Sequence, residues 1–297
     1  MITSTQNPRI KHLLLLQQKS AQRRADGLFV VEGRREVEHC LAAGFRLRTV
    51  FVCEAISPPP NLPQQPHPSP PKEGGTVAAS HPSFGGFGDG SFSPPLEGTG
   101  EAVEVVAVSP NVYERIAYRG GTEGIVAVVE ARQTALSELK LSPSPLIVVL
   151  ESVEKPGNLG AVLRSADAAG ADAVVVCDPL TDLYNPNLIR SAVGALFTVP
   201  CVACSTEDCI AFFKERGIQI LTAQLQDSRL YYDTPMTGPT AIVMGTEATG
   251  LTEQWRKAAD AHIRIPMLGR LDSLNVSVSA AILLFEAVRQ RQTGFKA

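Results

Sequence analysis

Three short blocks in the second half of the chain each follow an apolar, strand-like run and hold most of its candidate functional residues. They are Asn158–Arg164, Gly245–Gly250 and Ile265–Glu286. Near-continuous apolar strands that alternate with helices are typical of a mostly parallel sheet covered on both faces. In such open α/β sheets the ligand crevice lies beyond the carboxyl ends of the strands, where helix N-termini expose backbone N–H groups. The sequence therefore predicts an α/β fold with one site built from the three blocks.

Each block taken alone has a simpler, structural interpretation. Gly245 and Gly250 could allow turns with positive φ, and Asn158, Ser273 and Asn275 could cap the helices that follow them. The coincidence of all three blocks, in order and each at the end of an apolar strand, favours the ligand site.

The same residues resemble the motifs of a known family, the SpoU (TrmH) branch of the SPOUT RNA methyltransferases. The first motif, N-x-G-A-x-x-R, matches Asn158, Gly160, Ala161 and Arg164. The second matches Gly245, Thr246, Glu247 and Gly250, and the third matches Ile265, Pro266, Met267 and the run Ser273–Ser277. The resemblance is strong over about residues 146–291 and looser over 1–56 and 101–130.

The resemblance implies the fold, the reaction and the cofactor. The fold would be a SPOUT-type parallel-sheet domain with a trefoil knot, preceded by a small α/β domain similar to ribosomal protein L30e. The reaction would be transfer of a methyl group from S-adenosylmethionine to a ribose 2′-hydroxyl of structured RNA. The family also implies a homodimer.

Site residues follow from the same match. Those expected to contact S-adenosylmethionine, largely through main-chain atoms, are Gly245, Ile265 and Leu274. Those expected at the reacting group are Arg164, Asn158, Glu247, Ser273 and Asn275. Arginine stays protonated in proteins, so we expect Arg164 to bind the target phosphate and stabilise alkoxide charge rather than act as a simple base. Asn158 and Asn275 would orient Arg164 or the ribose, Ser273 would donate to RNA or to Glu247, and Glu247 would hold the loops or act as a cap.

The chain divides into two expected domains. Residues 1–130 form the RNA substrate-binding domain, residues 131–145 a linker, and residues 146–297 the methyltransferase domain. Between two strands of the first domain, residues 57–100 contain eleven prolines, eight glycines and six serines. Such a segment lacks the apolar content to form a core, so a disordered and inert insertion is expected.

Charge is unevenly distributed along the chain. The net charge is −3, yet residues 1–48 hold nine Lys/Arg against four acids, leaving the remainder at −8. A basic N-terminal segment, which includes Arg23 and Arg24, favours contact with RNA phosphates, although a solvated charged surface explains it equally well. A two-domain chain with a basic N-terminal half favours rRNA as the substrate, with tRNA as the alternative.

Other classes of protein are less consistent with the sequence. Neither G-x-G-x-x-G nor G-x-x-x-x-G-K-[ST] occurs, which argues against an ordinary nucleotide enzyme. A catalytically inactive RNA-binding homologue remains open. Six cysteines have no regular spacing, and Cys201-x-x-Cys204 lacks the further ligands of a zinc site, so no metal is expected. No apolar run suits a membrane span or a signal peptide, and a cytoplasmic location is expected.

Overall fold

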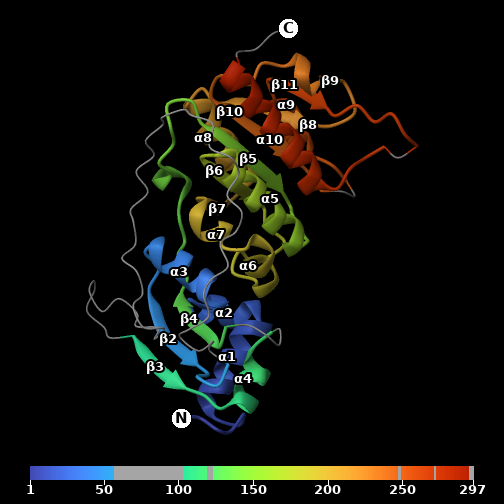
Figure 1. Ribbon diagram of the computed structural model, residues 1–297. Helices are drawn as coiled ribbons and strands as arrows, with labels where there is room; N and C mark the ends of the chain where they lie inside the picture. Colours follow the sequence, from blue (N-terminus) through green and yellow to red (C-terminus); the bar gives the residue numbers. More distant parts are fainter. Residues whose placement is uncertain (57–102, 119–122, 247–248, 271, 294–297) are drawn as a thin grey trace, which may run out of the picture.

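The computed structural model describes residues 1–56, 103–118, 123–246, 249–270 and 272–293. These residues form two β-sheets with helices packed on both, one sheet in the N-terminal half and one in the C-terminal half (Figure 1). The expected insertion at 57–100 lies outside the described residues, so its proposed disorder stays a prediction. In the part of the chain that is described, no helix combines the length and apolar character needed to cross a membrane.

The N-terminal sheet has four strands in the order β1-β4-β2-β3. β4 pairs antiparallel with both β1 and β2, and β2 pairs in parallel with β3. Its elements are α1 (Pro8–Gln18), α2 (Ser20–Asp26), β1 (Leu28–Glu32), α3 (Arg34–Ala42), β2 (Leu47–Val52), β3 (Glu104–Ala107), α4 (Pro110–Ile116) and β4 (Ile125–Glu130).

Helix starts in this half follow from capping chemistry. The Asn7 side chain accepts a hydrogen bond from Arg9 N at 2.9 Å, and Pro8 occupies the first helical position of α1, where its missing N–H costs nothing. Ser109 and Pro110 start α4 in the same way. These two pairs explain why both helices could be located from sequence.

The C-terminal sheet has seven strands in the order β7-β6-β5-β10-β8-β11-β9, and every strand pair is parallel. Its strands are β5 (Leu146–Glu151), β6 (Ala173–Cys177), β7 (Cys201–Cys204), β8 (Gln219–Ala223), β9 (Arg229–Leu230), β10 (Thr240–Met244) and β11 (Ala261–Arg264). Its helices are α5 (Pro156–Ala169), α6 (Pro186–Ala192), α7 (Ala195–Thr198), α8 (Thr206–Glu215), α9 (Glu253–Ala258) and α10 (Val276–Thr293), with short 3₁₀ turns η1 (Leu136–Glu138) and η2 (Tyr231–Asp233). The α/β class with a parallel C-terminal sheet is confirmed, whereas the knot and the L30e-like character stay predictions.

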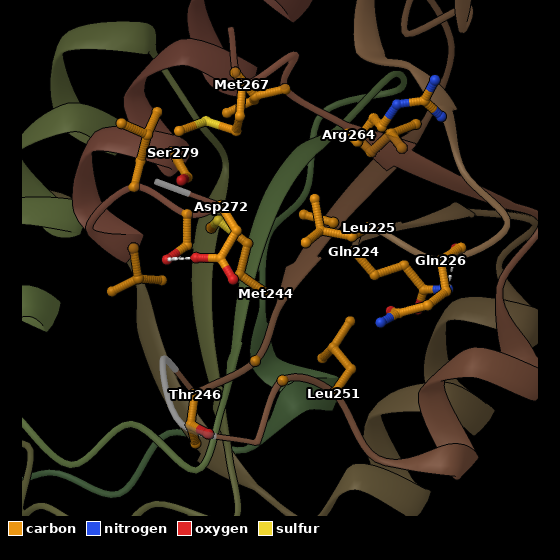
Figure 2. Close-up of a pocket in the computed structure, with 18 of the residues that line it drawn as sticks. Gln224, Leu225, Gln226, Met244, Thr246, Leu251, Arg264, Met267, Asp272 and Ser279 are labelled. Carbon is orange, nitrogen blue, oxygen red and sulfur yellow. Dashed lines mark hydrogen bonds between the residues drawn. The ribbon is translucent and has the colours of Figure 1, made fainter. Parts of the chain in front are cut away.

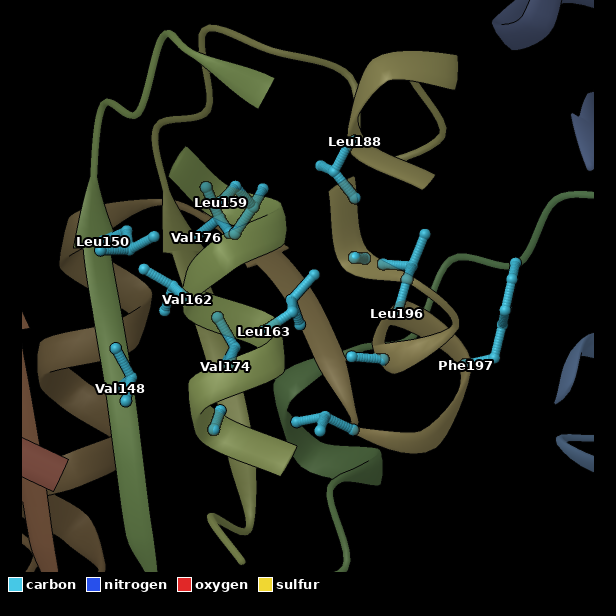
Figure 3. Close-up of a cluster of buried hydrophobic side chains, with 14 of the residues drawn as sticks. Val148, Leu150, Leu159, Val162, Leu163, Val174, Val176, Leu188, Leu196 and Phe197 are labelled. Carbon is cyan, nitrogen blue, oxygen red and sulfur yellow. The ribbon is translucent and has the colours of Figure 1, made fainter. Parts of the chain in front are cut away.

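Alternating side chains of the strands supply two hydrophobic layers. Val148 and Leu150 of β5 pack on Leu159 and Val162 of α5 on one face (Figure 3). On the other face, Ile147 and its neighbours pack against α8 and α9. The expected linker contributes here too, because Leu136, Leu139 and Leu141 lie against this second layer.

The two sheets share one hydrophobic cluster. The Phe29 ring of β1 stacks on Tyr184 with centroids 4.2 Å apart, and Phe45 meets Phe197 edge to face at 5.5 Å. The Tyr184 hydroxyl donates to Arg132 O at 2.7 Å, and burial raises its pKa to about 12. This contact fixes the N-terminal half against α6 and α7, and so fixes the position of the N-terminal sheet relative to the C-terminal sheet.

Arg23 belongs to this contact and does not reach solvent. Its side chain is 5% exposed and its Nε lies 2.6 Å from Asp182 Oδ2 across the boundary between the two halves. The interpretation of Arg23 as a phosphate contact is therefore wrong, because its charge is already paired in a buried position. The neighbouring Arg24 is exposed and remains available.

Candidate functional site

The loops after β8, β10 and β11 enclose a cavity of about 380 Å³ at the carboxyl edge of the C-terminal sheet. Figure 2 shows Gln224, Leu225 and Gln226 on one side of this first cavity and Met267 and Ser279 on the other. All three residues expected to contact a cofactor line it, namely Gly245, Ile265 and Leu274. The second and third sequence blocks therefore do meet at one place.

Gly245 is required by a close approach within its own loop. Thr246 and Gly250 form an isolated antiparallel bridge, with Gly250 N donating to Thr246 O at 3.0 Å. A Cβ on Gly245 would overlap the backbone of Gly250 and Leu251. Positive φ belongs to Gly250, at +67°, rather than to Gly245. The two glycines therefore form a tight turn that shapes the cavity floor.

Two side-chain atoms that belong to residues lining this cavity are buried and have no hydrogen-bond partner among the described residues. They are the Gln224 side-chain oxygen, an acceptor, and Arg256 Nε, a donor. Buried polar groups normally have partners, so these two atoms mark Gln224 and Arg256 as side chains that could turn toward a ligand offering both kinds of group. Sequence reasoning missed both residues; the signal was the position of Gln224 directly after β8, beside β10 in a parallel sheet.

A second cavity of about 340 Å³ adjoins the first. It lies between the ends of β5 and β10, and Gly245, Thr246 and Val276 line both cavities. The order of the strands reverses here, since the chain runs from β5 outward to β7 and later returns to β10 on the other side of β5. Such a switch point is where open α/β sheets bind ligands.

Asn158 and Asn275 join the first and third blocks beside this second cavity. Asn275 Nδ2 donates to Asn158 Oδ1 at 3.1 Å, and Asn275 Oδ1 accepts from Ser277 N at 3.0 Å. Asn275 is thus also the cap of α10, as the structural interpretation suggested. Asn158 does not cap α5, because that helix begins two residues earlier at Pro156. The bond holds the N-termini of α5 and α10 together.

Arg164 lies away from this pair. It is exposed on α5, six residues beyond Asn158, which places it about 9 Å further along the helix and turned by about 120°. Neither cavity is lined by Arg164. Its expected orientation by Asn158 or Asn275 stays a prediction.

The remaining two predicted residues have different outcomes. Ser273 lines the first cavity and donates to Asp272 Oδ1 at 3.4 Å. Glu247 lies outside the described residues, so neither its role nor its expected bond with Ser273 is tested. Gly160 of the first block packs α5 on α6, because a Cβ there would overlap Ser191 and the backbone of Ala192.

Glu151 is a buried carboxylate that sequence reasoning passed over. It ends β5, is 3% exposed and lines the second cavity. Its oxygens accept from Thr252 N at 2.8 Å and Thr252 Oγ1 at 2.6 Å, at the start of α9. A lone charge in an apolar strand was the available signal, because a buried charge needs partners. Glu151 links the end of β5 to the segment that follows the Gly245 loop.

Comparison with known proteins gives one consistent result. The SpoU rRNA methylase family model matches residues 145–285, and a model of an MRM3-like substrate-binding domain matches residues 7–78. A 23S rRNA (guanosine-2′-O-)-methyltransferase, RlmB of Pseudomonas putida, is 38% identical over 180 residues, covering 58% of this chain and 73% of the relative.

Two solved structures cover almost the whole chain. A crystal structure of an RNA 2′-O ribose methyltransferase superposes with a TM-score of 0.74 at 36% identity, covering 98% of this chain and 99% of the other. An AdoMet-bound rRNA methyltransferase from Sinorhizobium meliloti superposes with a TM-score of 0.77 at 26% identity, covering 97% of each chain.

Proposed function

Because the chain belongs to the SpoU rRNA methylase family, we propose that it transfers a methyl group from S-adenosylmethionine to a ribose 2′-hydroxyl of rRNA. The observation that carries this proposal is the pair of adjoining cavities with a common wall of Gly245, Thr246 and Val276. Methyl transfer needs a donor and an acceptor in line and in contact, and two cavities that meet at the same three residues would hold a donor and an acceptor side by side.

The first cavity suits S-adenosylmethionine. The ligand presents amino groups and a carboxylate, and Gln224 and Arg256, which line this cavity, would supply an acceptor and a donor once their side chains turn toward it. Gly245, Ile265 and Leu274 would enclose it through backbone and apolar contacts. When bound, its sulfonium supplies an electrophilic methyl group.

The second cavity suits the acceptor ribose. Lys155 and the Asn158–Asn275 pair lie on its rim or beside it and offer a positive charge and amide groups to a sugar-phosphate chain. We assign Arg164, which lines neither cavity, to a phosphate of the target strand beyond the ribose. Because a guanidinium stays protonated, the proton of the ribose hydroxyl passes to water or to a phosphate oxygen.

We also propose that the chain acts as a homodimer through α10. Val278 and Phe285 are 47% and 49% exposed, and with Ile282 they form one stripe at helical spacing. The opposite face of the helix, with Leu283 and Leu284, is buried in the core. A second copy would cover the exposed stripe. Phe285→Glu should then give monomers in sedimentation, with Leu15→Glu on α1 as the control; a wild-type monomer would contradict the dimer.

Methylation assays test the substrate. Protein is incubated with methyl-labelled S-adenosylmethionine and with rRNA or tRNA from cells that lack the gene, and 2′-O-methyl positions are then mapped. Label in rRNA at one ribose is expected. Label in tRNA alone would favour the alternative substrate. Calorimetric binding of S-adenosylmethionine without transfer to either RNA would indicate an inactive homologue. An rRNA substrate also carries the expectation of a cytoplasmic location.

A further inference from the structure

Three cysteines from three separate elements meet at the carboxyl edge of the C-terminal sheet. Cys177 ends β6, Cys204 ends β7 and Cys209 lies in α8, and their sulfur atoms are all within 4.8 Å of one another. Cys177 and Cys204 are register partners in adjacent parallel strands, with sulfur atoms 3.9 Å apart. We call these three residues the thiol cluster.

The spacing of these sulfur atoms fits a metal ion. Zinc binds thiolates at about 2.3 Å, so two sulfur ligands of a tetrahedral site lie about 3.8 Å apart. The Cys177–Cys204 separation of 3.9 Å already meets this value. The Cys209 sulfur lies within 4.8 Å of both, so a shift of about 1 Å at most would bring it to the same spacing. We propose that the thiol cluster is a trithiolate binding site for Zn²⁺ that fastens β7 and α8 to β6.

The surroundings suit a cation and leave a path to it. Two carboxylates lie on the loop and helix that carry these thiols: Asp178 accepts from Thr206 N at 3.3 Å and Asp208 accepts from Ser205 Oγ at 2.6 Å. Cys177 and Cys209 are buried, whereas Cys204 is partly exposed and gives access from solvent. Three protein ligands leave the fourth tetrahedral position to water.

The site is separate from both cavities. No cysteine lines either of them. β7 is one of the two edge strands of the sheet and pairs with β6 alone, so the metal would secure an edge strand that has a neighbour on one side only. The proposal is therefore independent of methyl transfer, and its expected effect is on the stability of this edge.

The Cys201-x-x-Cys204 spacing does not identify this site, because only Cys204 of that pair belongs to the thiol cluster. Side chains three positions apart on a strand point to opposite faces, and Cys201 packs with the layer that contains α5. Cys204 instead belongs to the layer with α8. The other two ligands of the cluster are Cys177, which precedes Cys204 on another strand, and Cys209, which follows it on α8. Cys201 is thus a matched control on the same strand.

Metal titration under reducing conditions tests the proposal. Chelator-treated protein is titrated with Cd²⁺, read by thiolate-to-metal charge-transfer absorption, and with Zn²⁺ in competition with a chromophoric chelator. One equivalent should bind to wild type and to Cys201→Ser. Cys209→Ser should weaken metal affinity by at least about 100-fold. Loss of a group that only hydrogen-bonds a metal ligand already costs up to about 100-fold, and Cys209 would be a ligand itself. Circular dichroism checks that each variant folds.

A second measurement needs no variant. Zn²⁺ should protect Cys204 and Cys209 of wild type from alkylation, with Cys201 unaffected, and should raise the thermal midpoint. Absence of saturable binding, or equal binding by Cys209→Ser and Cys201→Ser, would overturn the site. A Cys177–Cys204 disulfide in protein that binds no metal would assign the cluster to redox chemistry and would overturn it as well.

Discussion

Replacing Arg23 by alanine tests how the two halves of the molecule are held together. The Arg23 guanidinium donates to Asp182 Oδ2 at 2.6 Å, to Leu16 O at 2.6 Å and to Gln17 O at 3.2 Å. The substitution would leave the Asp182 carboxylate, 12% exposed, without its charged partner. Removing one member of a buried pair costs about 3–5 kcal/mol because the other charge stays buried.

The lower end of that range applies here. Asp182 Oδ1 keeps a hydrogen bond from Tyr184 N at 2.9 Å, which still stabilises the carboxylate after the substitution. We therefore expect Arg23→Ala to lower the free energy of unfolding by about 3 kcal/mol, more than a hundredfold in the folding equilibrium. Urea unfolding followed by fluorescence and by circular dichroism measures it.

Arg24→Ala is the matched control. Arg24 is exposed on the same helix, so its loss should change stability by no more than about 0.5 kcal/mol. For RNA affinity the order of the two variants should reverse: Arg24→Ala should weaken binding more than Arg23→Ala. Of these two residues only Arg24 can reach a phosphate and contribute to the salt dependence of affinity. Equal destabilisation by the two variants, or a larger change of salt slope for Arg23→Ala, would refute the assignment of Arg23 to the buried pair.

Three further outcomes are expected. Arg164→Ala should abolish methyl transfer to rRNA while calorimetric affinity for S-adenosylmethionine stays within about twofold, because Arg164 lines neither cavity; parallel loss of both would make it a folding or cofactor residue. Gly245→Val should weaken cofactor affinity at least tenfold, roughly 1.4 kcal/mol, since the side chain would displace the Gly250 backbone; unchanged affinity in a folded variant would place the cofactor elsewhere. Hydrogen bonding to Arg289 lowers the pKa of Glu286 from its ordinary 4.5, so its contribution to stability is present above pH 4.5 and is lost as the pH falls below that value. Glu286→Gln should therefore be less stable than wild type at pH 7 and equal to it at low pH, and a constant difference across the pH range would contradict this.

Local chemistry decided which parts of the fold could be predicted from the sequence. The Asn7 cap and the apolar run of β5 act on neighbouring residues, so their elements were predictable. The burial of Arg23 depends on Asp182, 159 positions away, and no local pattern reports such a pairing.

The same distinction applies to the site. Gly245, Ile265 and Leu274 were identifiable because a motif carries them, and the structure places all three around one cavity. Gln224 and Arg256 belong to no motif and became visible only when the parallel sheet brought the ends of β8 and β10 together.

The shared aromatic contact between the two sheets also bears on synthesis of the chain. The N-terminal sheet can close once β4 is made, at Glu130, yet Tyr184 and Phe197 cover the Phe29 ring. At about 5–20 residues per second, the intervening stretch takes several seconds to translate. During that interval a folded N-terminal sheet carries an uncovered aromatic face on the ribosome. We expect this uncovered face to be a point at which the nascent protein can aggregate or be held by a chaperone until residues 184–197 are made.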